Sequence, residues 1–142
     1  MRRLAITVLT FWGVAFGLST TARAAELVYF FSGACPVCER WDEEIGGLYD
    51  KTEESKRLPL RRHDIHQNKP DDLGFIKGVI YTPTFVLVED GHEVGRMVGY
   101  VTDYFFWEQL SGLIHKADSA RGARTTACSG SGSGGDEQRK VC

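Results

Sequence analysis

The chain has 142 residues, with 17 Lys and Arg against 19 Asp and Glu, and a formal net charge of −2 at pH 7. This length allows one domain of ordinary size. The charge excludes a basic protein that binds nucleic acid, and 42% hydrophobic residues exclude a strongly charged disordered chain. These averages combine three stretches of different composition: a leader, a folded domain and a tail.

Residues 1–24 have the pattern of a secretory signal peptide. Two arginines precede an uncharged apolar run over 4–18, which is shorter than the about 20 residues that a membrane-spanning helix needs. Small residues at Ala22 and Ala24 then supply a cleavage site. We expect cleavage after Ala24, with cleavage after Ala25 or an uncleaved anchor as alternatives. Export follows from this interpretation, and it places the cysteines where disulfides persist.

The C-terminal stretch, residues 117–142, is predicted to be a flexible tail. Apolar periodicity is lost, and the Gly/Ser-rich run 129–135 buries too little apolar area to offset its ordering entropy. This stretch carries Cys128 and Cys142. The two cysteines could join each other, Cys142 could reach the active site or another protein, or the tail could be incidental. The folded domain is therefore predicted over residues 25–116.

The first half of this domain predicts a strand, a helix and a second strand. The apolar run 26–31 indicates a buried strand. From Pro36 apolar residues recur at helical spacing, and Gly46-Gly47 is expected to weaken or kink this helix, at about 1 kcal/mol for each glycine. Residues 58–65 are predicted to form the second strand, and residues 71–78 a short helix.

The second half predicts a hairpin and a closing helix. Strands are expected over 84–89 and 93–99, and Asp90-Gly91 between them is a strong turn signal. The last helix begins at Thr102 or Asp103, either of which can cap it. The order β-α-β-(α)-β-β-α implies an α/β domain with a mixed sheet and helices on both faces.

Several charged and aromatic residues are assigned structural roles. The acids at 42–44 and the pair Arg61-Arg62 are expected on solvated faces. Trp41, Trp107 and Phe105-Phe106 fall on the apolar stripes of predicted helices, so we expect them in the core.

The motif Cys35-Pro36-Val37-Cys38 lies where the first predicted strand meets the first helix. The first turn of a helix presents unpaired N–H groups and the positive end of the helix dipole, so a thiolate is favoured at Cys35. Cys35 would be the nucleophile, and Cys38, one turn inward, would resolve the mixed disulfide. The alternatives are half of a zinc site, for which no second Cys-x-x-Cys or His pair stands at suitable spacing, and a structural disulfide. We favour redox chemistry and expect no metal.

A second signal is Thr82-Pro83, directly before the predicted strand 84–89. Together with residues 30–38 and Gly99-Tyr100, in this order and spacing, it makes the chain resemble the thioredoxin superfamily. The resemblance spans about residues 26–115. It implies the thioredoxin fold, a mixed four-stranded sheet flanked by helices.

The resemblance also implies a substrate-binding site around the cysteines. The peptide bond before Pro83 would be cis, with the proline against the cysteine pair; a trans proline that opens an edge strand is the alternative. The backbone of Thr82 would pair with a substrate strand, next to Pro36 and Val37. The two residues between the cysteines, Pro36 and Val37, also tune the reduction potential, over about −270 to −120 mV.

Within the superfamily, the short exported proteins associated with sulfur-oxidation gene clusters (the SoxS type) look most similar. The resemblance implies a periplasmic, monomeric thiol–disulfide oxidoreductase that reduces disulfides or mixed disulfides of exported partner proteins, such as those of a sulfur-oxidation system. Because no nicotinamide or flavin motif is present, electrons would come from a membrane thiol transporter, with no cofactor beyond the redox-active disulfide. A disulfide oxidase or isomerase and a non-catalytic binding module are the alternatives.

The chain departs from the ordinary thioredoxin pattern in three places. Ala34 replaces the tryptophan before the first cysteine, and Pro-Val replaces Gly-Pro between the cysteines. Tyr29 stands where thioredoxins carry a buried aspartate, six residues before the first cysteine. The proton acceptor for Cys38 is therefore unassigned, with Glu39 or water as candidates.

Overall fold

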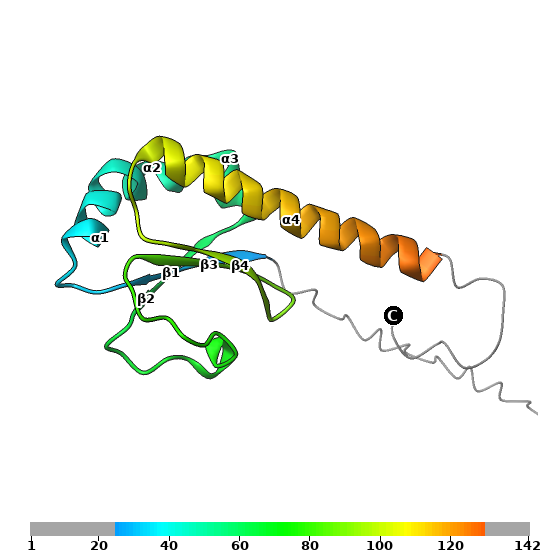
Figure 1. Ribbon diagram of the computed structural model, residues 1–142, viewed down its shortest axis with the longest axis horizontal. Helices are drawn as coiled ribbons and strands as arrows, with labels where there is room; N and C mark the ends of the chain where they lie inside the picture. Colours follow the sequence, from blue (N-terminus) through cyan, green and yellow to red (C-terminus); the bar gives the residue numbers. More distant parts are fainter. Residues whose placement is uncertain (1–24, 130–142) are drawn as a thin grey trace, which may run out of the picture.

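The structure, a computed structural model, describes residues 25–129, which form a four-stranded sheet with helices packed on it (Figure 1). The strands are β1 (Glu26–Phe31), β2 (Leu60–Asp64), β3 (Thr84–Glu89) and β4 (His92–Val98). The helices are α1 (Pro36–Trp41), the π-helical turn η1 (Asp42–Gly46), α2 (Gly47–Tyr49), α3 (Glu53–Arg57), the 3-10 turn η2 (Asp71–Leu73) and α4 (Asp103–Ser129). The predicted leader, 1–24, and the end of the chain, 130–142, lie outside the described residues. No helix within 25–129 is long and apolar enough to cross a membrane.

The sheet has the strand order β2-β1-β3-β4 and is mixed, as predicted. β1 runs parallel to β2 and antiparallel to β3, and β3 forms the predicted hairpin with β4. All of β3 and the interior of β1 are buried, which explains why both strands read as continuous apolar runs. The α/β class and the thioredoxin-type sheet predicted from the sequence are confirmed.

Alternate residues of β1 and β3 face two separate apolar clusters, because successive strand side chains point to opposite faces. One cluster lies under the α-helices and includes Leu27, Tyr29, Trp41, Ile45, Tyr49, Phe85, Leu87, Phe106 and Leu110. The other contains Val28, Phe30, Val86 and Val88, covered by Leu73 and Ile76. Within the described residues, the α-helices thus pack on one face of the sheet, and the segment 65–79 covers the other (Figure 1).

The prediction of helices on both faces of the sheet relied on a short helix over 71–78. This short helix is not formed as predicted. Only the three residues of η2 are helical in this segment. Gly74 ends the turn, and Gly78 has φ +66, outside the helical region. Two glycines within eight residues disfavour a longer helix, at about 1 kcal/mol each.

The first helix bends where the two glycines were predicted to weaken it. The backbone widens into η1 at Asp42–Gly46 and then returns to the short helix α2. Helix α3 was not predicted. It begins at Thr52, whose Oγ1 accepts the N–H of Ser55 at 3.2 Å and so caps the helix.

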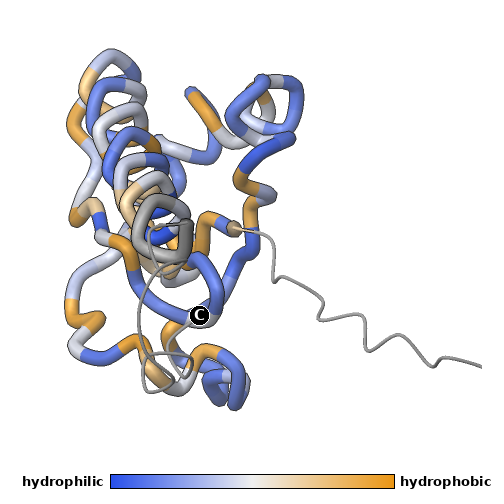
Figure 2. The backbone as a smooth tube through the Cα atoms, turned by 90° about the vertical axis from the view of Figure 1, so that its right-hand side faces the viewer, coloured by the Kyte–Doolittle hydropathy of each residue, from blue (hydrophilic) through white to orange (hydrophobic). Residues whose placement is uncertain are grey.

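Helix α4 corrects the predicted domain boundary, because it continues to Ser129 instead of ending near residue 116. Ala117 is buried in the core under the helices. Beyond it, Arg121 and Arg124 bind Glu89, whose side chain is only 6% exposed at the end of β3. Ion pairs hold this part of the helix to the sheet, so apolar periodicity could not reveal it. Figure 2 shows hydrophilic and hydrophobic residues alternating along the coils of α4.

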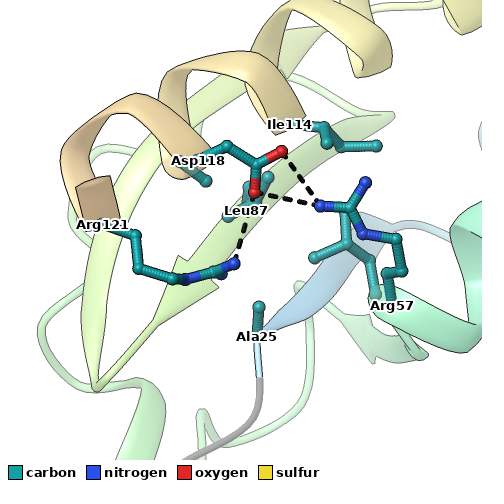
Figure 3. A pocket seen from close by; sticks show the side chains of 8 residues that line it. Ala25, Arg57, Leu87, Ile114, Asp118 and Arg121 are labelled. Atoms are coloured by element: carbon teal, nitrogen blue, oxygen red, sulfur yellow. Dashed lines mark hydrogen bonds and ion pairs between the residues drawn. The ribbon is translucent and has the colours of Figure 1, made fainter.

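A pocket of about 240 Å³ separates α4 from α3 and the start of β1 (Figure 3). Asp118 bridges it, because its carboxylate accepts hydrogen bonds from Arg57 at 3.0 Å and from Arg121 at 3.2 Å. The floor is apolar and includes Leu87 and Ile114. The same ion-paired network therefore ties α3 and the sheet to the second half of α4.

One aromatic residue lies outside the predicted core. Phe106 is buried and Trp107 packs against the core, but Phe105 is 51% exposed. Consecutive residues of a helix point about 100° apart, so Phe105 and Trp107 lie on opposite sides of Phe106, and the face of α4 that meets the core includes Phe106 and Trp107 but not Phe105.

We expect the double substitution Arg121→Ala/Arg124→Ala to lower the free energy of unfolding by about 1–3 kcal/mol, because it leaves the buried Glu89 carboxylate without these partners. Urea denaturation followed by circular dichroism measures this change. Lys116→Ala is the matched control, since it removes an exposed cation from the same helix that is not a partner of Glu89. Equal losses in both variants would contradict the ion-pair role.

Candidate active site

The two cysteines of the motif form a disulfide at the start of α1, with their Cα atoms 5.2 Å apart. Cys35 is the N-cap residue of α1, and its Sγ accepts the backbone N–H of Cys38 at 3.1 Å. Pro36 follows in the first turn, where the helix does not need its missing N–H. Cys35 is half-buried, whereas Cys38 is 2% exposed. Cys35 is therefore the more accessible of the two cysteines.

The segment before β3 is distant from Cys35 in the sequence but lies beside it in the structure. The Thr82–Pro83 peptide bond is cis, as predicted, and Cys35 Sγ lies 3.4 Å from the carbonyl oxygen of Thr82. The N–H of Gly99 donates to the Pro83 carbonyl at 2.7 Å, which links this segment to the end of β4. Pro83 is buried and Thr82 is partly exposed. The structure thus brings together the motif and the proline loop.

Exposed apolar side chains lie on the segments that meet at this point. They are Val37, Ile80, Tyr81, Val98 and Val101. Val37 and Tyr81 are next to Cys38 and Thr82 in the chain, and Val98 pairs with Thr84 across the hairpin. Exposed apolar side chains on the segments around a reactive disulfide offer surface that a partner could cover.

Tyr29 fills the space beneath the motif where the thioredoxin pattern has an aspartate. Its side chain is fully buried, and its ring packs against Trp41 and Phe85 at centroid distances of 4.7 and 4.8 Å. The hydroxyl donates to the carbonyl of Cys38 at 3.4 Å. Burial, and secondarily the charge of Asp42, raise the pKa of Tyr29, although Arg62 acts in the opposite direction. Tyr29 is therefore a protonated donor beside the cysteine pair.

The charged residues expected on solvated faces are exposed or partly exposed, as predicted, and some of them also form specific ion pairs. Arg62 Nη2 lies 2.6 Å from Asp42 Oδ1, and Arg61 Nη1 lies 2.6 Å from Asp72 Oδ2. The Arg62 guanidinium also lies over the Tyr29 ring, 5.2 Å from its centroid. These partners are far apart in sequence, so no local pattern could identify them.

A second group of charges joins α1 to the loop after β4. Arg40 Nη2 donates to the carbonyl of Tyr100 at 3.0 Å, and the Tyr100 hydroxyl binds the carboxylate of Glu44. Burial, followed by the hydrogen bond to Glu44, raises the pKa of Tyr100, so its hydroxyl is the donor. This network was missed from the sequence, and it holds the Gly99-Tyr100 turn beside the motif.

An open depression of about 450 Å³ lies on the α1 side of the disulfide. It is lined by Phe31, Ser32, Gly33, Cys35, Cys38, Glu39, Asp42 and Glu43. The carboxylates come from α1 and η1, and both cysteines of the disulfide line the same depression. Among residues 25–129, no three His, Cys, Asp or Glu side chains are grouped so that they could hold a metal ion.

Comparisons with known proteins place the chain in a family. No protein-family model matches it, and no curated protein matches it either. Among solved structures, the periplasmic thioredoxin SoxS from Paracoccus pantotrophus in its reduced form is 38% identical, with a TM-score of 0.62. The match covers 66% of this chain and 98% of that one. The chain belongs to the thioredoxin superfamily.

More distant thioredoxins support the fold alone. Thioredoxin NaTrxh from Nicotiana alata is 24% identical with a TM-score of 0.50, over 64% of this chain and 75% of that one. A thioredoxin from Malassezia sympodialis is 17% identical with a TM-score of 0.50, over 64% and 78%. As a member of the thioredoxin superfamily with a Cys35–Cys38 pair, this chain is a thiol–disulfide oxidoreductase.

In the reduced thioredoxin, we expect limiting iodoacetamide at pH 7 to alkylate Cys35 at least about tenfold faster than Cys38. Cys35 is more exposed, and the Cys38 N–H and the helix start stabilise its thiolate. Mass spectrometry of the digested protein measures both rates. The preference should vanish in denaturant, and equal rates in the folded protein would contradict the prediction.

Proposed function

We propose that this thioredoxin is a periplasmic reductase of disulfides or mixed disulfides on exported proteins, with Cys35 as nucleophile and Cys38 as resolving cysteine. The observation that carries the proposal is the position of Cys35, at the N-cap of α1 and 3.4 Å from the Thr82 carbonyl. The predicted signal peptide supports the location. So does the 38% identity to a thioredoxin described as periplasmic.

The reaction transfers two electrons from the dithiol to the substrate. The Cys35 thiolate attacks one sulfur of the substrate disulfide, forms a mixed disulfide and expels the other sulfur as a thiolate. The Cys38 thiol then loses its proton and attacks Cys35 Sγ, which closes the Cys35–Cys38 disulfide and releases the second thiolate. The two leaving thiolates take up the two protons that the cysteines lose. No further cofactor or metal enters this sequence.

The substrate would bind over the apolar surface around the motif. The partly exposed Thr82 would offer its backbone to an extended segment of the partner, and Pro83 would shape this groove. Pro36 and Val37 are exposed between the cysteines and would contact the residues that flank the partner's cysteine. We infer that the protein acts as a monomer on exported protein thiols, including those of a sulfur-oxidation system, and is itself reduced by a membrane thiol transporter.

Substitution of the cysteines tests the catalytic roles. We expect Cys35→Ser to abolish reduction of a protein disulfide such as that of insulin, because no thiolate remains to attack. Cys38→Ser should instead accumulate a covalent mixed disulfide with substrate, visible on non-reducing gels. The double variant Cys128→Ser/Cys142→Ser is the control, and we expect it to keep full activity. Full activity of Cys35→Ser would refute the proposed function.

The reduction potential separates a reductase from an oxidase, which is one of the alternatives left open by the sequence. We expect a potential near −270 mV, measured by equilibration with glutathione or dithiothreitol buffers. A value near −120 mV would assign the protein to the oxidases instead. Val37→Ala changes only one of the two residues between the cysteines. We expect it to shift the reduction potential without loss of the fold.

A further inference from the structure

Release of the substrate requires a proton acceptor for Cys38, and the site has to supply one. Cys38 is 2% exposed and borders solvent only at the open depression that it lines, so a group at this depression has to direct the proton away from its thiol. Tyr29, which stands in the place of the family's aspartate, cannot take the proton. Its hydroxyl already donates to the Cys38 carbonyl, and burial favours its protonated form.

Asp42 is placed to take this role. It lies one helical turn after Cys38, and its backbone N–H donates to the Cys38 carbonyl. Residues four apart on a helix lie on the same face, with Cβ atoms about 5–6 Å apart. Asp42 and Cys38 also line the same open depression beside the disulfide, and the Asp42 side chain is 35% exposed. A proton that reaches this carboxylate can therefore pass on to solvent.

Arg62 holds Asp42 in that position from the neighbouring strand. Arg62 lies opposite Tyr29 in the β1–β2 register, and its guanidinium lies 2.6 Å from Asp42 Oδ1. The rings of Tyr29 and Trp41 lie beneath it, 5.2 and 5.8 Å from its Cζ. A Cβ atom at Gly46 would lie only 3.1 Å from Arg62 Nη2 and 3.2 Å from Asp42 Oδ1. The glycine in η1 thus leaves room for this ion pair.

We propose that Asp42, positioned by Arg62, accepts the proton of the Cys38 thiol as Cys38 attacks the mixed disulfide. This inference rests on the proposed function. The Cys38 S–H bond breaks, the proton passes through a water molecule in the depression to the Asp42 carboxylate, and the electron pair left on Cys38 forms the bond to Cys35 Sγ. The substrate sulfur leaves with the electron pair of the broken bond, and Asp42 returns its proton to solvent.

The other charged groups around Asp42 are less suited to this role. Glu39 and Glu43 line the same depression, but both are exposed, and neither forms the contact with Arg62 that orients Asp42. Glu39 directly follows Cys38, so it points about 100° away around the helix axis. Arg62, from β2, is a cation, and Tyr29, from β1, is a hydrogen-bond donor.

The reaction of the reduced protein with the aromatic disulfide DTNB separates the two steps. In the Cys128→Ser/Cys142→Ser background, attack by Cys35 releases the first coloured thiolate, and resolution by Cys38 releases the second. For Asp42→Asn we expect the second phase to slow on the order of 100-fold at pH 7, with an unchanged first phase. The deficit should shrink as pH rises, because hydroxide then removes the proton. Asp42→Glu should restore part of the rate.

Matched variants make the outcome decisive. Glu39→Gln removes a carboxylate from the same depression and should leave both phases unchanged. Arg62→Gln should slow the second phase, since it releases Asp42. A second phase in Asp42→Asn within about threefold of the parent, or an equal loss in Glu39→Gln, would overturn the inference. A parent protein that reduces no protein disulfide would instead refute the proposed function, whatever Asp42 does.

Discussion

The antiparallel pairing of β1 with β3 is the constraint on which the site depends. Because these central strands run in opposite directions, the end of β1 lies beside the start of β3, with Phe30 opposite Thr84. The cysteine motif follows β1, and the Thr82–Pro83 bond precedes β3, so both reach the same edge of the sheet. Burial of both strands on two faces fixes their register, since a slip of one residue would turn every apolar side chain to the wrong face.

The residues around the cysteines form two charged connections to the scaffold, and each uses α1 or η1. Asp42 binds Arg62 on β2, and Arg40 binds the loop at Tyr100. Ion pairs at an exposed surface contribute little to stability, typically less than about 1 kcal/mol. Their importance here is geometric, because they connect the helix that carries Cys38 to two other parts of the fold. The replacement of an aspartate by Tyr29 fits this arrangement, since an aromatic ring fills the space under the Arg62 guanidinium.

The second half of α4 illustrates a different limit of pattern analysis. Sequence periodicity detects a helix through its apolar face, and that face ends with Ala117. Arg121 and Arg124 then attach the helix to Glu89, which follows the apolar run of β3. Each of these residues looks like ordinary surface charge in the sequence. Their roles appear only when the end of β3 and the helix are known to be neighbours.

Local chemistry determined most of the order of elements and the motif. The strand at 84–89, the hairpin turn at Asp90-Gly91 and the bend at Gly46-Gly47 follow from side-chain alternation and from the backbone preferences of glycine. The spacing of Cys35 and Cys38 at a helix start, with a proline before a later strand, sufficed to predict redox chemistry. These features depend on residues close in sequence, and their physical causes are local.

Only the tertiary structure decided which distant groups meet. It placed Cys35 against the Thr82 carbonyl, paired Asp42 with Arg62, and covered the second face of the sheet with an irregular segment instead of a helix. Such contacts depend on strand order and on the packing of the whole domain. A carboxylate at 42 cannot be paired with Arg62 until β2 is known to lie beside β1. The proton acceptor proposed for Cys38 therefore belongs to the fold and could not be identified from the motif.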